Sequence, residues 1–283
     1  MSKTINDQDE SHNKEEELSP RSGGAQLGDE FKDKVEFQNI MVATEDTIQQ
    51  QYLMELVVGH QYPMLVVGDT GTGKTRAIKK LISLLLKKQT SEGKYGWESG
   101  EMVLSATSTP SQIQFYTESK LEKHKKGVYG PKNPSNHLLI FIDDLNMPVK
   151  EKFGAQPSLE MMRQIIDQRG FYSEKTLEFS NIVRQIFLCA MGTPGGGRSL
   201  PSTRLMRHFN LVNFPNMSKE TMTRIFRRIL DWGFANYNST WQKQIIIITE
   251  LTISTFQKAV EVLLPLPRKA HYLFNVRQIS EII

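Results

Sequence analysis

The sequence has a single cysteine, Cys189, so no disulfide can form within its 283 residues. It also lacks a long apolar run, because the candidates at 245–248 and 263–266 are far shorter than the about 20 residues of a membrane span. The beginning, Met1 to Asn6, has no apolar core of a signal peptide. We therefore expect a cytoplasmic protein in a reducing compartment, without a membrane partner.

A strong excess of charge is also missing. Lys and Arg number 35 against 31 Asp and Glu, and the basic residues are scattered along the chain. A nucleic-acid-binding surface concentrates basic residues in one patch or stripe, so we expect no nucleic-acid partner. The hydrophobic content of 39% is sufficient for a substantial core.

Residues 1–34 contain few large apolar side chains and are rich in Ser, Glu, Asp, Lys, Gln and Gly. Such a segment buries too little apolar surface to offset the entropy of ordering. We predict a disordered polar tail over 1–34 and an ordered chain from Val35.

The most informative segment that is present is a complete phosphate-binding loop, Gly68-Asp69-Thr70-Gly71-Thr72-Gly73-Lys74-Thr75. The glycines let the chain curl around a phosphate, Lys74 reaches the β- and γ-phosphate oxygens, and the Thr75 hydroxyl ligates Mg²⁺. A chance glycine turn before a helix is the alternative. An apolar run at 64–67 and a helical pattern at 76–86 lie on the correct sides of the loop, which favours ATP or ADP binding with Mg²⁺.

Short apolar segments alternate with helical patterns over the next part of the chain. We predict strands at 64–67, 101–106, 137–142, 181–191 and 211–214, helices at 44–60, 76–86, 111–126 and 157–169, and a Gly- and Pro-containing loop at 127–134. The inner face of the first helix is assigned to Ile48, Tyr52, Leu53, Leu56 and Val57. This alternation predicts an α/β fold with a five-stranded parallel sheet flanked by helices.

Only helical patterns follow Pro215, at 218–234, 243–264 and 270–283. We therefore predict three regions: the tail at 1–34, a large α/β nucleotide-binding subdomain at 35–215 and a small helical lid at 216–283. The last helix ends on Ile282 and Ile283 without a glycine or asparagine cap, so we expect the lid to be incomplete and the chain to be a fragment, a short isoform or the product of a truncated gene.

Two adjacent carboxylates, Asp143 and Asp144, follow the apolar strand at 138–142. The metal held by Thr75 and the phosphates needs an acidic group at the end of a neighbouring strand, and we assign that role to Asp143. Asp144 would face the attacking water as a catalytic residue. An aspartate is one methylene shorter than a glutamate, so its reach is smaller.

Several further segments accompany the phosphate loop: Phe141-Ile142-Asp143-Asp144-Leu145-Asn146-Met147-Pro148, Gly154-Ala155-Gln156-Pro157, Gly192-Thr193-Pro194-Gly195-Gly196-Gly197-Arg198 and Arg204-Leu205-Met206-Arg207-His208-Phe209-Asn210. Together they resemble an AAA+ module of an axonemal dynein heavy chain, most closely the third of the six modules in the ring. The resemblance runs from about Val35 to Ile283.

The resemblance implies roles for three arginines. Arg204 and Arg207 lie where such a module presents an arginine to the nucleotide of its neighbour, and the choice between the two stays open. Arg277 matches the lid arginine that contacts the γ-phosphate. The resemblance also implies other dynein modules or subunits as partners, an indirect association with microtubules, and a location in the cytoskeleton of the ciliary axoneme.

Two departures from the family pattern indicate slow, regulatory hydrolysis. The polar sensor that usually ends the fourth strand, often an asparagine, is missing, and Thr193 stands nearby; Asp144 occupies the usual glutamate position. The chain also has no heptad repeat for a stalk and only one phosphate loop, so it is not an autonomous motor. A non-hydrolysing structural protein that acts through subunit contacts is the alternative, and a monomeric phosphate-loop kinase is less favoured.

Overall fold

The computed structural model describes residues 40–283 except 93–95, 175, 196, 236–238 and 270. The predicted disordered tail lies outside these residues. Residues 42–283 form one compact unit. No helix in the described ranges combines the length and apolar character that crossing a bilayer requires.

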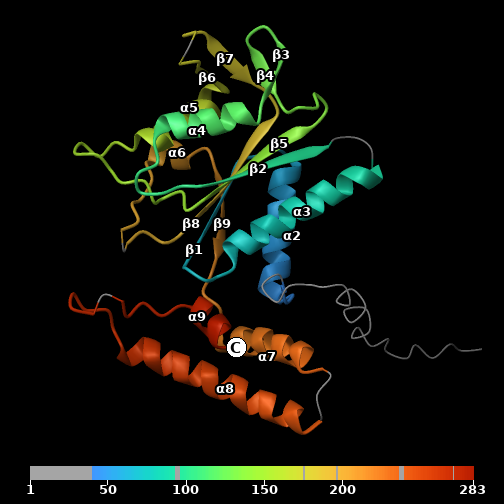
Figure 1. The fold of residues 1–283 in the computed structure, drawn as a ribbon, viewed down its shortest axis with the longest axis vertical. Helices are drawn as coiled ribbons and strands as arrows, with labels where there is room; N and C mark the ends of the chain where they lie inside the picture. Colours follow the sequence, from blue (N-terminus) through green and yellow to red (C-terminus); the bar gives the residue numbers. More distant parts are fainter. Residues whose placement is uncertain (1–39, 93–95, 175, 196, 236–238, 270) are drawn as a thin grey trace, which may run out of the picture. The chain divides into compact units, whose positions relative to one another are not determined.

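Five parallel strands form the central sheet of this unit. They are β1 (Met64–Gly68), β2 (Trp97–Val103), β5 (His137–Asp143), β8 (Gln185–Met191) and β9 (Asn210–Phe214), in the order β2-β5-β8-β1-β9 (Figure 1). Every neighbouring pair is parallel. The prediction of a five-stranded parallel α/β sheet is confirmed.

Helices cover both faces of the sheet. Helices α2 (Glu45–Gly59) and α3 (Lys74–Glu92) lie on one face, and α4 (Pro110–Ser119) and α5 (Pro157–Gln168) lie on the other (Figure 1). Leu138, Ile140 and Ile142 of β5 pack into the cluster that includes α4 and α5. Leu139 and Phe141 alternate with them, point to the opposite face and are also buried. Burial on both faces explains the continuous apolar run of this strand.

A second sheet, which the sequence analysis did not predict, contains β3 (Glu122–Lys125), β4 (Val128–Gly130), β7 (Phe179–Ile182) and β6 (Gly170–Tyr172) in the order β3-β4-β7-β6. The predicted helix at 111–126 is therefore wrong after Ser119, and the predicted loop at 127–134 contains β4. Gly127 has a φ of 72° and makes the turn between β3 and β4.

The predicted strand at 181–191 is two strands in different sheets. Arg184 has a φ of 57°, which breaks the extended backbone between β7 and β8. The predicted strand at 101–106 is β2, which begins earlier, at Trp97, and ends at Val103.

The predicted inner face of α2 was wrong. Ile48, Tyr52 and Leu56 are exposed, whereas Met54 and Val58 are buried. Apolar residues lie on both faces of this helix, so spacing alone could not identify the buried one.

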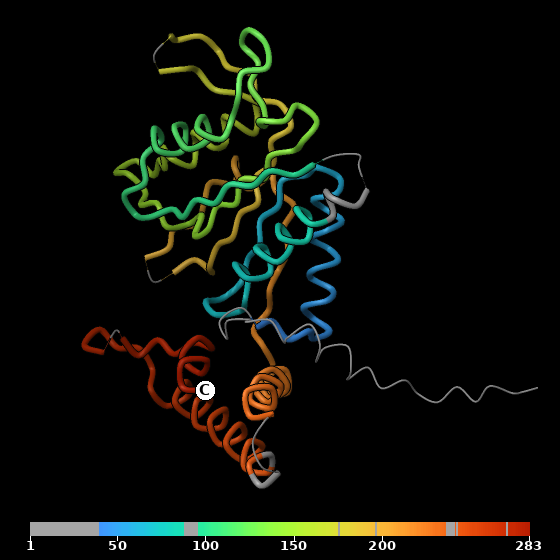
Figure 2. Tube along the Cα trace, turned by 45° about the vertical axis from the view of Figure 1, so that its right-hand side comes forward, coloured from blue at the N-terminus to red at the C-terminus, as the bar shows by residue number. Residues whose placement is uncertain are grey.

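After the short helix α6 (Thr203–Met206) and strand β9, the chain forms α7 (Lys219–Gly233), α8 (Ser239–Val262) and α9 (Val276–Ile282), coloured orange to red in Figure 2. Met222, Phe226, Ile253 and Ile279 form the core that these three helices share. Helix α9 begins at Val276 rather than at residue 270, because Asn275 and Gln278 form a capping box there.

Candidate functional site

The phosphate loop connects β1 to α3 at the edge of the sheet where the parallel strands end. The carboxyl ends of β5 and β8, at Asp143 and Met191, lie at the same edge because these strands run parallel to β1. In open α/β sheets this edge is where ligands bind.

The three loop glycines are required for two different reasons. Gly71 and Gly73 each have a φ of 87°, in the left-handed region that glycine adopts readily. Gly68 instead lies against β9: a Cβ there would be 2.4 Å from the Phe214 carbonyl oxygen. Gly68 therefore permits close packing of β1 and β9, and the other two shape the loop.

Lys74 is almost fully buried under the loop, with 9% of its surface exposed. Its Nζ donates to the carbonyl oxygens of Gly68 at 2.8 Å and Asp69 at 2.6 Å. Burial lowers the pKa of Lys74, and the nearby positive charge of Arg198 lowers it further. An anion beside Lys74 would offset both effects, so this cation fits a phosphate ligand.

Thr75 and Asp143 are brought together from α3 and β5. The Thr75 hydroxyl donates to Oδ2 of Asp143 at 2.8 Å. A hydroxyl and a carboxylate are oxygen ligands of the kind that Mg²⁺ prefers in phosphate-loop sites, and Mg²⁺ would neutralise phosphate charge there. The residues present therefore fit Mg²⁺ together with nucleotide phosphates.

Asp144 lies beside this pair with a strained backbone, since its φ is 51°. Its carboxylate faces Arg198, whose Nη2 lies 3.5 Å from Oδ1. The same guanidinium donates from Nη1 to the Thr70 hydroxyl at 3.0 Å. Arg198 thus connects the phosphate loop with the end of β5, a position that the sequence analysis did not assign to it.

Asp69, a loop residue predicted to bind nucleotide, is held by two other segments. Thr193, just after β8, donates its hydroxyl to Oδ1 at 2.6 Å, and Asn216, between β9 and α7, donates Nδ2 to Oδ2 at 2.8 Å. These hydrogen bonds lower the pKa of Asp69. Thr193 therefore contacts the phosphate loop directly, although its residue type differs from the usual sensor.

The predicted trans-acting arginines lie outside this cluster. Arg207, at the end of α6, is 62% exposed and lies 3.6 Å from Asp167 Oδ1. Arg204 is exposed and has neither a hydrogen bond nor an ion pair with another residue in the described ranges.

Arg277 is next to the loop through its backbone rather than its side chain. A Cβ on Gly71 would be 3.3 Å from the backbone nitrogens of Val276 and Arg277. The Arg277 side chain is exposed and reaches no hydrogen-bonding partner among the described residues.

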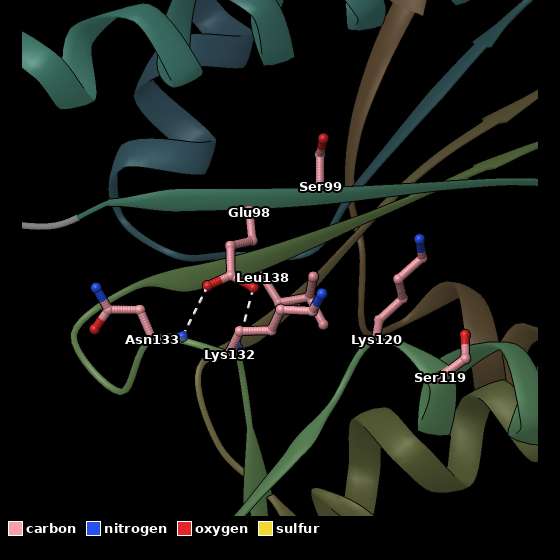
Figure 3. A pocket seen from close by; sticks show the side chains of 7 residues that line it. All are labelled: Glu98, Ser99, Ser119, Lys120, Lys132, Asn133 and Leu138. Carbon is pink, nitrogen blue, oxygen red and sulfur yellow. Dashed lines mark hydrogen bonds between the residues drawn. The ribbon is translucent and has the colours of Figure 1, made fainter.

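A separate hollow of about 560 Å³ lies near the start of β2 and β5, where Glu98 pairs with Leu138 (Figure 3). The Glu98 carboxylate accepts hydrogen bonds from the backbone nitrogens of Lys132 at 3.1 Å and Asn133 at 3.0 Å. Because the phosphate loop follows the end of β1, this hollow is distinct from the candidate nucleotide site.

Comparison with known proteins agrees with this geometry. Residues 29–217 match the family described as P-loop containing dynein motor region. The chain is 39% identical to human dynein axonemal heavy chain 1 over 257 residues, which cover 86% of this chain and 6% of that protein. It is 38% identical to human dynein axonemal heavy chain 2 over 247 residues, or 87% of this chain and 5% of that protein.

Human dynein axonemal heavy chain 12 is 38% identical over 260 residues, which cover 91% of this chain and 8% of that protein. The chain thus spans less than a tenth of the length of these curated relatives. The family implies nucleotide binding through the loop, normally with Mg²⁺. The parallel sheet, the phosphate loop with Asp143 beside it, and the extent of the match lead to one assignment: the chain belongs to the family of P-loop containing dynein motor regions.

Proposed function

We propose that this chain is an ATP-binding AAA+ module of dynein heavy chain type, with slow or regulatory hydrolysis. One observation carries this proposal: the buried Lys74 and the hydrogen-bonded pair Thr75 and Asp143 lie at the same edge of the sheet. These groups supply the cation and the metal ligands that a nucleoside triphosphate needs.

Slow turnover is supported by the surroundings of Asp144. A general base must reach the attacking water, and aspartate is shorter than the glutamate usual at this position. Asp144 also faces the Arg198 guanidinium at 3.5 Å, which orients its carboxylate toward another side chain. The Thr193 hydroxyl donates a hydrogen bond to Asp69 of the loop at 2.6 Å, so its proton is not free to orient the attacking water.

We place the chain within a larger dynein assembly, as the third module of a ring, where Arg204 or Arg207 would serve the nucleotide of a neighbour. The exposure of both arginines supports this role. A cation supplied in trans stabilises the charge of the transition state. Arg277 is proposed as the lid residue that responds to the γ-phosphate. In this role the chain supports microtubule-based ciliary movement indirectly, from the axoneme.

A non-hydrolysing structural module is the second candidate, favoured by the same Asp144 geometry. Binding of Mg·ATP and single-turnover hydrolysis by the purified chain distinguish the two, beside Lys74→Ala and Asp144→Asn. We expect wild type to bind Mg·ATP at least about 10-fold more tightly than Lys74→Ala, because a charged hydrogen-bonding partner is lost.

Slow turnover that Asp144→Asn abolishes supports the regulatory ATPase. Binding without any turnover, unchanged in Asp144→Asn, supports the structural module. Equal binding by wild type and Lys74→Ala rules out the nucleotide site. Turnover that rises with protein concentration supports an arginine supplied by a neighbouring copy.

A further inference from the structure

The turn between Gly195 and Arg198 has a structural role that the proposed function does not use. The backbones of Gly195 and Arg198 exchange hydrogen bonds of 3.1 and 3.0 Å, which close a tight turn. Gly195 and Gly197 have φ values of 131° and 89°, which glycine adopts readily. Gly195 and Gly197 therefore allow the chain to turn back, which brings Arg198 toward the phosphate loop.

The Arg198 side chain occupies space that is open because residue 192 is a glycine. A Cβ on Gly192 would lie 2.4 Å from Nη1 of Arg198, so a larger residue would displace the guanidinium. On the other side of the turn, the Ser199 backbone nitrogen donates to the Asn146 carbonyl oxygen at 3.0 Å. Asn146 in turn donates Nδ2 to the Gly192 carbonyl oxygen at 2.8 Å and is fully buried. Both ends of the loop are thus attached to one buried residue, Asn146, one end through its backbone carbonyl and the other through its side chain.

The position of Arg198 places a second cation in the candidate nucleotide site. Its side chain is 26% exposed, and its positive charge lowers the pKa of Lys74. Two cations held this close repel each other, and this cost is offset when an anion lies between them. The guanidinium has five donors in a fixed fork, a geometry that matches phosphate oxygens.

We propose that Arg198 is a phosphate-binding residue of this chain's own site, which contacts the terminal phosphate and so distinguishes a nucleoside triphosphate from a diphosphate. The inference rests on the proposed nucleotide site. Arg198 lies between Thr70 of the loop and Asp144, next to the metal-binding pair, which is the terminal-phosphate side of the site. Its 3.5 Å contact with Asp144 is long for an ionic hydrogen bond, so a phosphate can replace it.

The test is equilibrium binding of a non-hydrolysable ATP analogue and of ADP, both with Mg²⁺, to the full chain and to Arg198→Ala. We expect the analogue to bind about 10- to 100-fold more weakly, the range for losing a hydrogen bond to a charged group. ADP affinity should change by less than about 3-fold, because the terminal phosphate is absent. Arg198→Lys, which keeps the charge but not the fork, should recover part of the difference.

Arg227→Ala is the matched control, since Arg227 is an exposed arginine on α7 whose only described ion pair is with Asp231 on the same helix. It removes one positive charge and should leave both affinities unchanged. A thermal melt of each variant checks the fold, and the ratio of the two affinities reports discrimination even if stability falls.

The outcomes separate this inference from the proposed function. If wild type binds neither nucleotide more tightly than Lys74→Ala, the proposed function fails. If wild type binds both but Arg198→Ala leaves the ratio of the two affinities unchanged, Arg198 only positions Asp144 or the loop, and the inference is overturned. A selective loss of triphosphate affinity supports it.

Discussion

Two groups of basic side chains differ sharply in this chain. Lys74 is held by backbone carbonyls of the phosphate loop, and Arg198 by Thr70 of that loop and Asp144 after β5, at the carboxyl edge of the sheet. Arg204 and Arg277 have exposed side chains that hydrogen-bond to nothing else in the described part of the chain. The first group is arranged by the fold itself and suits a ligand bound within the chain. The exposed side chains of the second group are free to contact a partner or ligand from outside the chain.

The largest expected effect comes from Gly68→Ala, which changes the residue whose carbonyl oxygen accepts a hydrogen bond from Lys74. The added Cβ would meet the Phe214 carbonyl oxygen at 2.4 Å, and we expect the free energy of unfolding to fall by about 2 to 3 kcal/mol. Urea denaturation measures it. Gly59→Ala is the control, because nothing lies within 4 Å of its Cβ, and it should be neutral or stabilising. Similar losses in both variants would contradict the close packing of β1 and β9.

A smaller effect is expected from Asp69→Ala, which removes the carboxylate that joins Thr193 and Asn216 to the loop. We expect a loss of about 1 to 2 kcal/mol in the free energy of unfolding near neutral pH, because hydrogen bonds to a charged group are lost. Asp69→Asn should lose less, because its amide oxygen can still accept from Asn216 and its amide nitrogen can donate to the Thr193 hydroxyl.

The pH dependence of this loss has a defined sign. The pKa of Asp69 is lowered in the folded chain, so its contribution is complete above the unfolded-state pKa of about 3.9 and disappears as pH falls through the folded-state value. Denaturation of wild type and Asp69→Ala from neutral pH to about pH 3 measures the difference. A difference that stays constant over this range would refute the assignment.

Asp144→Glu should act on the chemistry rather than on stability. If reach limits the attack of water, the longer carboxylate should raise the single-turnover rate of ATP hydrolysis by about 10-fold, a change of about 1.4 kcal/mol in the barrier. ATP affinity, measured in parallel, should be unaffected. An unchanged rate would show that the length of this side chain does not limit turnover.

The smallest expected effect is that of Arg204→Ala on the isolated chain. Its side chain has no partner in the described ranges, so the free energy of unfolding should change by less than about 0.5 kcal/mol. Arg207→Ala should behave similarly, because the Arg207 side chain is 62% exposed and its ion pair with Asp167 is a surface one. A larger destabilisation by either substitution, measured by thermal unfolding, would place that residue in the first group.

The sequence predicted the features that depend on local patterns. The loop from Gly68 to Thr75 and the buried strand before Asp143 needed only residue type and spacing. The second sheet was missed because its strands have only three or four residues, and because β4 and β7, which join its two strand pairs, lie far apart in the chain.

The partners of the loop could not be read from the sequence for a related reason. Asp69 and Asn216 are 147 residues apart, and Arg198 and Thr70 are 128 apart. These contacts follow from the order of strands in the sheet, which a linear pattern does not give. The glycines before Arg198 were an available signal, because glycine readily adopts the positive φ angles of a tight turn.

The hydrogen bond between Asn216 and Asp69 couples the phosphate loop to the segment that leads into the C-terminal helices. Asn216 lies in the short segment between β9 and helix α7, and Asp69 lies in the phosphate loop. Linkage between two binding events is reciprocal, so their coupling free energy has the same value in both directions. If a contact that draws Asn216 away from the loop changes nucleotide affinity, nucleotide binding changes the affinity of that contact by the same factor.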